Sequence, residues 1–222
     1  MRKLFSLIVG IIIFSGLPLL GWGIYDFTGF IQNPYRLAYI CMMAVLSVLV
    51  VIFVPNEGRG EGEGVSLVKK HKFSLLFLQI VPTLVILFSP LFDRRSIAVL
   101  CNGNNIRAIG LIITFLGYMM MNWSVLVLGR QFSVDVTLQE NHKLITRGPY
   151  KYIRHPRYLG IITFFGGIPL IFNTWIPLTL ILLTIIVLRW RISDEEKMMK
   201  QEFTLDWDSY KKRSWRLIPF LY

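Results

Sequence analysis

The chain has 222 residues, of which 54% are hydrophobic and 17% are charged. Soluble domains carry about 25% charged residues, so the composition excludes an ordinary water-soluble domain and indicates a membrane protein. The net charge is +11, but Lys and Arg gather in a few polar connections, which argues against a nucleic-acid partner. Two cysteines and three scattered histidines show no metal-ligand spacing, so we expect neither a metal site nor a disulfide framework.

Three apolar runs in the N-terminal half predict membrane-spanning helices, at 4–25, 37–54 and 73–92. Each run approaches the roughly 20 residues that a spanning helix needs. The first run is longer than the apolar region of a signal peptide and lacks an A-x-A cleavage signal, so we interpret it as a helix. Pro18 is expected to kink it. We assign residues 1–105 to a lipid-facing scaffold of transmembrane helices.

Three further apolar runs follow, at 106–128, 158–172 and 175–189. Only Asn173 and Thr174 separate the last two runs, and so short a connection implies an antiparallel helical hairpin. Each arm of about 15 residues would measure roughly 22 Å at about 1.5 Å per residue. The predicted fold is therefore an all-α integral membrane protein of about six transmembrane helices, ending in a short helical hairpin.

The polar tail after residue 189 contains an apolar stripe. Met199, Phe203, Trp207 and Tyr210 are spaced four, four and three residues apart, as on one face of a helix. This spacing predicts a cytosolic amphipathic helix that lies in the membrane interface. The alternative is a helix that packs on the protein's own cytosolic loops.

The distribution of positive charge predicts the orientation. Six crossings place the N-terminus, the connections at 55–72 and 129–157, and the tail on one side of the membrane. That side carries 20 of the 24 Lys and Arg residues, and the positive-inside rule makes it cytoplasmic. We expect a multi-pass protein with both termini in the cytoplasm, in the plasma membrane of a prokaryote or the endoplasmic reticulum of a eukaryote.

The stretch TRGPYKYIRHPRYLG, at 146–160, directly precedes the first arm of the hairpin. Anchoring at a membrane edge would need only basic and aromatic residues, not Gly-Pro-Tyr and His-Pro in fixed order. The second arm leads into Arg191 and Glu195, which share one helix face. The hairpin should return this pair beside the 146–160 stretch. Taken alone, Arg191 and Glu195 would form a surface ion pair worth a few tenths of a kcal/mol. His155 taken alone would be an ordinary turn residue before a proline.

The combined pattern is more specific than its parts. GPYKYIRHPRYLG is followed by a hairpin, by R-x-x-x-E-E, by F-x-x-x-W-x-x-Y, and by R-L-I-P near the end. This order resembles the isoprenylcysteine carboxyl methyltransferase family and its wider group of phospholipid and small-thiol methyltransferases. The resemblance covers residues 128–219, and it departs from the family at Thr204, which is usually Gly, and at Trp207, which is more often Tyr.

The resemblance implies a methyltransferase core at 106–222 that uses S-adenosylmethionine. It assigns Arg191 to the orientation of the substrate, and Arg191 and Glu195 to catalysis. The residues that it assigns to the cofactor are His142, Lys143, Leu144, Ile145, Tyr150, His155, Pro156, Arg157, Tyr158 and Glu195. A carboxylate and aromatic faces suit the cationic sulfonium, and the fork of an arginine suits a carboxylate substrate.

The sequence leaves the class of methyl acceptor open. A carboxylate is ionised near neutral pH and needs no base, whereas an amine or a thiol would want one, from Glu195, Glu196 or His155. Carboxyl O-methylation of a prenylcysteine-like or other lipophilic substrate, entering from the bilayer among membrane lipids, is the first hypothesis. Phospholipid N-methylation and small-thiol S-methylation are the alternatives within the group. An NADPH-dependent sterol-type reductase and a non-enzymatic membrane scaffold are the other two hypotheses.

Overall fold

A computed structural model describes residues 2–54, 72–101, 103–129, 132 and 143–221. Helices dominate these residues, and within them β-pairing is limited to two isolated bridges. The elements in chain order are α1 (Arg2–Ile11), the π-helical η1 (Ile12–Gly16), α2 (Leu17–Trp22), η2 (Ile24–Asp26), α3 (Phe27–Ile31), α4 (Pro34–Phe53), α5 (Lys72–Arg94), α6 (Asn105–Leu128), η6 (Gly148–Lys151), α7 (Pro156–Ile171) and α8 (Ile176–Arg213).

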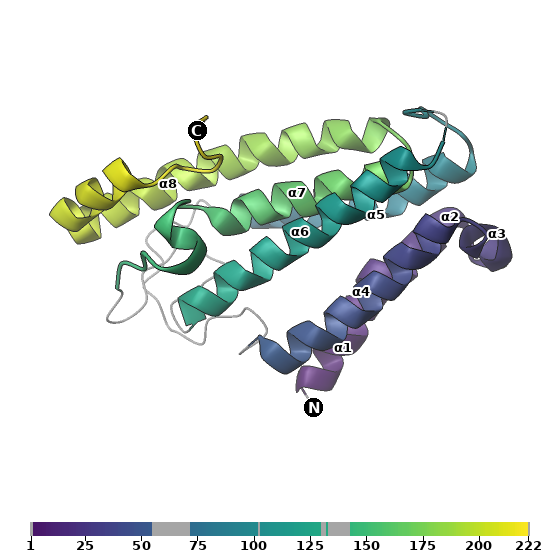
Figure 1. Ribbon diagram of the computed structural model, residues 1–222, viewed down its shortest axis with the longest axis horizontal. Helices are drawn as coiled ribbons and strands as arrows, with labels where there is room; N and C mark the ends of the chain where they lie inside the picture. The colour runs from purple at the N-terminus through teal and green to yellow at the C-terminus, as the bar shows by residue number, and fades with distance from the viewer. Residues whose placement is uncertain (1, 55–71, 102, 130–131, 133–142, 222) are drawn as a thin grey trace.

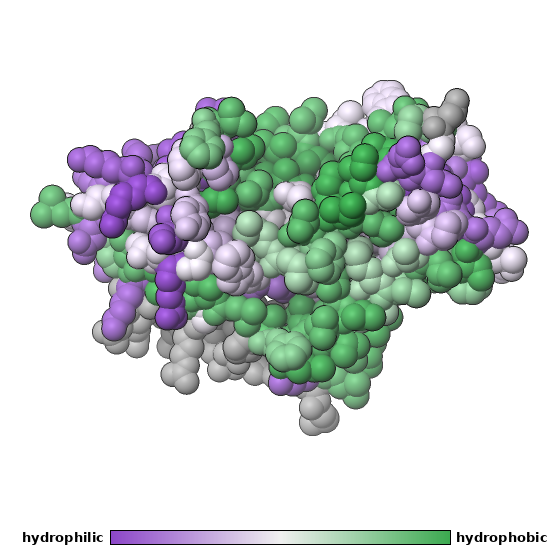
Figure 2. All heavy atoms as spheres, viewed as in Figure 1, coloured by the Kyte–Doolittle hydropathy of each residue, from purple (hydrophilic) through white to green (hydrophobic). Residues whose placement is uncertain are grey.

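Long apolar helices make the body of the molecule. Among the residues that the structure describes, five helical segments are long and apolar enough to cross a membrane, and α7 is a shorter apolar helix. In Figure 2 a broad hydrophobic band lies between hydrophilic groups at the two ends of the long axis. The prediction of an all-α, multi-pass integral membrane protein is therefore confirmed.

The first apolar segment is not a regular α-helix. The run Lys3–Trp22 passes through the π-helical turn η1, and Pro18 stands in the first turn of α2 immediately after it. Proline cannot donate to the helical ladder, and a π-turn is one way in which a helix accommodates the missing bond. The irregularity expected at Pro18 thus appears as a wide turn just before it.

Helices α6 and α7 pack closely along their length (Figure 1). Glycines allow the close approach: a Cβ on Gly160 would lie 2.7 Å from the Met121 nitrogen, and one on Gly110 would lie 2.5 Å from the Ile171 nitrogen. Between helices in a membrane, small residues let backbones approach and gain van der Waals contact. This packing fixes the position of α7, which carries the motif residues at its start.

The predicted hairpin joins α7 and α8. Asn173 adopts a positive φ of 50° in the turn, and its Nδ2 donates to the Cys101 carbonyl oxygen at 2.8 Å. An isolated bridge between Val99 and Thr174 adds a second tie to the loop before α6. The turn is therefore fastened to the end of the bundle opposite the motif.

The prediction of a separate amphipathic helix after an apolar arm ending at 189 was wrong in its boundaries. Helix α8 continues to Arg213, and its only non-helical backbone lies at Thr204, with φ 37° and ψ −97°. The bend interrupts the stripe that was expected on a single helix face. The residues beyond the bend turn back toward the start of α7, where Trp207 and Tyr210 are buried by the protein itself.

We predict that Gly160→Ala lowers the thermal stability of the detergent-solubilised protein. Its Cβ would press on the backbone of α6, and overpacking of this kind costs about 1–3 kcal/mol. For a chain of this size each kcal/mol corresponds to about 2–4 °C in melting temperature. Gly166→Ala is the matched control on α7, because its Cβ would meet nothing within 4 Å. Equal melting temperatures for the two variants would contradict the packing argument.

Candidate functional site

The hairpin brings the start of α7 and the middle of α8 together at one end of the molecule. Tyr158 donates its hydroxyl to Glu195 Oε1, and His155 Nδ1 lies 3.4 Å from Glu195 Oε2. Arg191 Nη2 lies 3.9 Å from Glu195 Oε1, one helical turn away on the same face. The juxtaposition predicted from the short turn, of the 146–160 stretch with the Arg191 and Glu195 pair, is therefore present.

Arg191 is almost fully enclosed, with 2% of the residue exposed. Its Nε donates to the Tyr158 hydroxyl oxygen at 3.3 Å, and its Nη1 donates to Ser74 Oγ at 3.0 Å. Ser74 belongs to α5, so the N-terminal half also supplies a side chain to this cluster. A serine at the start of an apolar run carries no sequence signal for such a contact.

Glu196 is held by cations on both sides. Arg154 Nε donates to its Oε1 at 2.8 Å, and Arg216 Nε donates to its Oε2 at 3.0 Å. His155 Nε2 also lies 3.4 Å from Oε1. Adjacent helical residues point in different directions, so Glu195 faces Arg191 and Tyr158 while Glu196 faces the two arginines. Glu196 is thus engaged in holding these segments together.

The C-terminal tail is fastened to the segment before α7. The Arg154 amide donates to the Trp215 carbonyl at 2.8 Å, and the His155 amide donates to the Arg216 carbonyl at 3.1 Å. Ile153 and Trp215 form an isolated parallel bridge. The sequence motifs R-H-P and R-L-I-P, about 60 residues apart, are therefore paired. The arginines at 154 and 216 were not among the predicted site residues, although both lie in the motif strings.

Tyr150 contacts the part of α8 that follows the bend. Its side chain is buried, and its carbonyl oxygen accepts from the Tyr210 hydroxyl at 2.7 Å. Trp207 packs edge-on against Tyr210, with ring centroids 5.7 Å apart. Of the two arrangements considered for the tail, these residues therefore show packing on the protein itself.

The remaining predicted site residues lie around this cluster. Pro156 is buried in the first turn of α7, and the Arg157 guanidinium stacks over Phe132, with 4.3 Å from Cζ to the ring centroid. The segment 143–145 runs without regular structure toward η6, and no hydrogen bond or ion pair between described residues joins it to the cluster. His142 lies outside the described residues.

The electrostatic environment favours a charged His155. Burial alone would lower the pKa of His155, but the two carboxylates of Glu195 and Glu196 outweigh burial and raise it above the ordinary value of 6.5. His155 also stacks on Tyr158, with the rings 9° from parallel and their centroids 5.8 Å apart. The site therefore places an imidazole whose charged form is favoured between two carboxylates, with a phenol and a buried guanidinium beside it.

Comparison with known proteins finds a family match that includes His155, Tyr158, Arg191 and Glu195. Residues 108–201 match the sequence profile of the isoprenylcysteine carboxyl methyltransferase family. A probable protein-S-isoprenylcysteine O-methyltransferase of Oryza sativa subsp. japonica is 28% identical over 118 residues, which cover 51% of this chain and 61% of the relative.

Two further relatives show the same extent of similarity. Protein-S-isoprenylcysteine O-methyltransferase B of Arabidopsis thaliana is 30% identical over 50% of this chain and 58% of its own length. The protein-S-isoprenylcysteine O-methyltransferase of Saccharomyces cerevisiae is 28% identical over 51% of this chain and 48% of its own length. The matched region thus spans about half to three-fifths of these relatives.

We predict a pH dependence of stability that comes from His155. Its folded-state pKa is raised, so its contribution is complete below about pH 6.5 and is lost as the pH rises through the folded-state pKa. The melting temperature in detergent should therefore fall above pH 6.5 in the unmodified protein, and His155→Gln should remove this part of the fall. The double variant His71→Gln, His142→Gln is the control and should keep it. An unchanged pH profile in His155→Gln would contradict the charged bridge.

Proposed function

We propose that this chain is a membrane methyltransferase of the isoprenylcysteine carboxyl methyltransferase type that uses S-adenosylmethionine, a proposal supported by the motifs and by the family match over residues 108–201. The reaction moves a methyl group to a lipophilic acceptor, with carboxyl O-methylation of a prenylcysteine-like substrate as the first candidate. The observation that carries the proposal is the set of contacts joining His155 and Tyr158 to Arg191 and Glu195.

The site has the charges that a cationic methyl donor requires. Glu195 offers a carboxylate whose side chain is 21% exposed, and the ring of Tyr158 has a face that attracts cations. Arg157 Nε is buried and lacks a hydrogen-bond partner among the described atoms, so its guanidinium suits the donor's carboxylate. When bound, the donor supplies an electrophilic methyl carbon. We propose that the rest of the donor wall consists of His142, Lys143, Leu144, Ile145, Tyr150, His155 and Pro156.

The role proposed for Arg191 is to orient the acceptor. Its guanidinium is held by Ser74 and Tyr158, so its planar fork has a fixed direction that matches a carboxylate. A carboxylate acceptor is ionised near neutral pH and needs no base, so catalysis would rest on positioning, which can supply about 7–11 kcal/mol. For an amine or thiol acceptor, Glu195 would take the proton, because the charged form of His155 is favoured and Glu196 is engaged by two arginines.

Access to the site follows from the proposed orientation. The positive-inside rule puts the motif end of the molecule in the cytoplasm, where a water-soluble donor is available. The lipophilic acceptor would arrive from the bilayer, since α8 exposes apolar side chains such as Leu182, Leu183 and Ile186 just before the site. Donor and acceptor would therefore approach the same cluster from different phases.

We predict that Glu195→Gln weakens binding of S-adenosylmethionine by about tenfold, measured by calorimetry on the purified protein in detergent. Loss of one charge-assisted contact is worth about 1.4 kcal/mol or more, which is a factor of ten. Glu202→Gln makes the same change on an exposed position of α8 and should bind within about twofold of the unmodified protein. Equal affinity for all three proteins would remove Glu195 from the donor site.

The acceptor class is decided by a tritiated-methyl transfer assay. It offers a farnesylcysteine analogue, phosphatidylethanolamine and a small thiol side by side to the purified protein. We expect label in the prenylated analogue as a base-labile methyl ester, because Arg191 suits a carboxylate. Label in the phospholipid or the thiol instead would reassign the acceptor while retaining the donor site. The absence of transfer and of donor binding would refute the proposed activity.

A further inference from the structure

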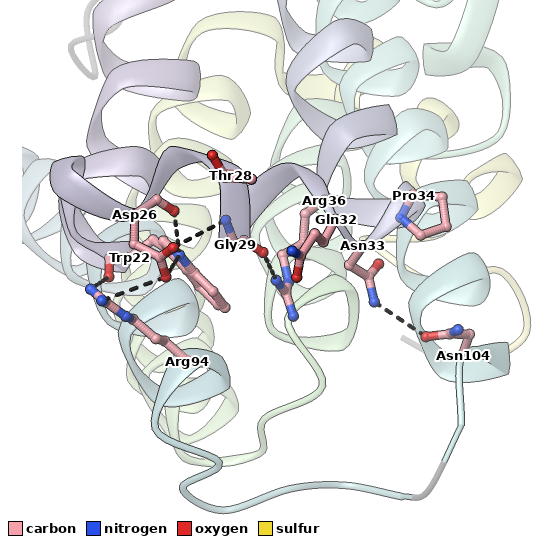
Figure 3. Close-up of a pocket in the computed structure, with 10 residues that line it drawn as sticks. All are labelled: Trp22, Asp26, Thr28, Gly29, Gln32, Asn33, Pro34, Arg36, Arg94 and Asn104. Carbon is pink, nitrogen blue, oxygen red and sulfur yellow. Dashed lines mark hydrogen bonds and ion pairs between the residues drawn. The ribbon is translucent and has the colours of Figure 1, made fainter.

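An open pocket lies at the end of the molecule opposite the candidate site. Figure 3 shows it between the loop that follows α2, the start of α4, the end of α5 and the start of α6, and its volume is about 720 Å³. Neither the motifs nor the proposed methyl transfer uses it. The side chains that matter most for its chemistry are Trp22, Asp26, Arg36 and Arg94.

The acceptor groups of the pocket are already used within the protein. Asp26 caps α3, because its Oδ1 accepts from the Gly29 amide at 3.1 Å, and its Oδ2 accepts from Trp22 Nε1 at 3.1 Å. The Trp22 carbonyl accepts from Arg94, and the Gly29 carbonyl accepts from Arg36 at 3.0 Å. The one carboxylate that lines the pocket is therefore already paired.

The donor groups, in contrast, are in surplus. Arg36 lies over the Trp22 ring, with 4.1 Å from Cζ to the centroid, and its Nη1 donates to the Gly29 carbonyl (Figure 3). Its Nε donates to Asp93. Arg94 donates through Nη1, and its Nη2 lies 3.5 Å from Asp26 Oδ2. Within the described part of the chain, no hydrogen bond is made by Arg36 Nη2 or by Arg94 Nε. The Arg94 side chain is 41% exposed.

The charge balance of this end of the molecule is positive. Two arginines and one aspartate line the pocket, and the neighbouring Asp93 is shared by Arg36 at 2.9 Å and Arg107 at 2.7 Å. Three arginines thus face two carboxylates. Guanidinium groups with free donors and an excess positive charge match an anion that carries several oxygens, above all a phosphate.

The surroundings of the pocket indicate where such a phosphate would come from. Large apolar side chains beside it are exposed, with Ile24 59%, Tyr25 98% and Phe27 54% accessible. In Figure 2 the hydrophilic groups at this end adjoin the hydrophobic band. Exposed aromatic and aliphatic side chains beside a polar pocket are typical of the headgroup level of a bilayer. From this geometry we infer that the pocket binds the phosphate headgroup of a membrane phospholipid.

Native mass spectrometry of the full chain released from detergent, with added phosphatidylglycerol, tests the inference. Arg94→Gln should weaken retention of the lipid by about tenfold, and Arg94→Lys should recover part of it because the charge is kept. Arg95→Gln is the matched control, since it removes the same charge from the next residue, which is exposed and does not line the pocket. Equal losses in Arg94→Gln and Arg95→Gln would overturn the site.

Two further measurements distinguish a phospholipid from other ligands of the pocket. Diacylglycerol, which has the same chains and no phosphate, should not be retained, and inorganic phosphate should compete only weakly with the lipid. If inorganic phosphate displaced the lipid fully, the pocket would be a site for soluble phosphate, and the lipid assignment would be wrong. If Arg94→Gln failed to fold, Gln32→Glu would replace it: Gln32 is exposed in the pocket, and a negative charge there should also lower retention. Undiminished retention in that variant would contradict the inference.

Discussion

Two adjacent carboxylates at the polar end of the molecule determine how the neighbouring segments pack together. The side chains of Glu195 and Glu196 are 21% and 8% exposed, and removing a carboxylate from water costs several kcal/mol unless it is paired. Compensation comes from the segment before α7, from α8 itself and from the C-terminal tail. Because these segments are distant in sequence, neutralising the pair also assembles them. The same contacts therefore hold the tail in place and define the site.

The sequence was sufficient to predict features with local causes. The apolar runs predicted the helices, two residues between runs predicted the hairpin, and a spacing of four placed Arg191 and Glu195 on one face. The contacts of Ser74 and Arg216 with the site could not be predicted, because they depend on how α5 packs and where the tail runs after α8. A serine in an apolar helix and an arginine in a basic tail have many ordinary explanations. Only the assembled bundle shows which partner each has.

The bend in α8 shows why the helical spacing of the tail residues gave a wrong prediction there. Thr204 has φ 37°, a conformation that a β-branched residue rarely adopts and that costs about 1–3 kcal/mol. Glycine would adopt such a backbone without a Cβ clash. A helical stripe running through Thr204 is therefore the natural prediction, yet burial of Trp207 and Tyr210 beyond the bend offsets the strain. Tertiary burial outweighs the local preference of the residue.

The geometry of the site depends on contacts far from it, because α7 is short and fixed along its whole length. Its glycines press it against α6, Asn173 ties its end to the loop before α6, and the tail binds the segment before its start. His155, which caps α7, and Tyr158, in its first turn, are thus held by a helix that has little freedom to slide. Arg191 and Glu195 sit on a different helix, whose register relative to α7 is set by the same short turn. Preorganisation of the four side chains is therefore a property of the hairpin, and a small shift at its distant turn would separate them.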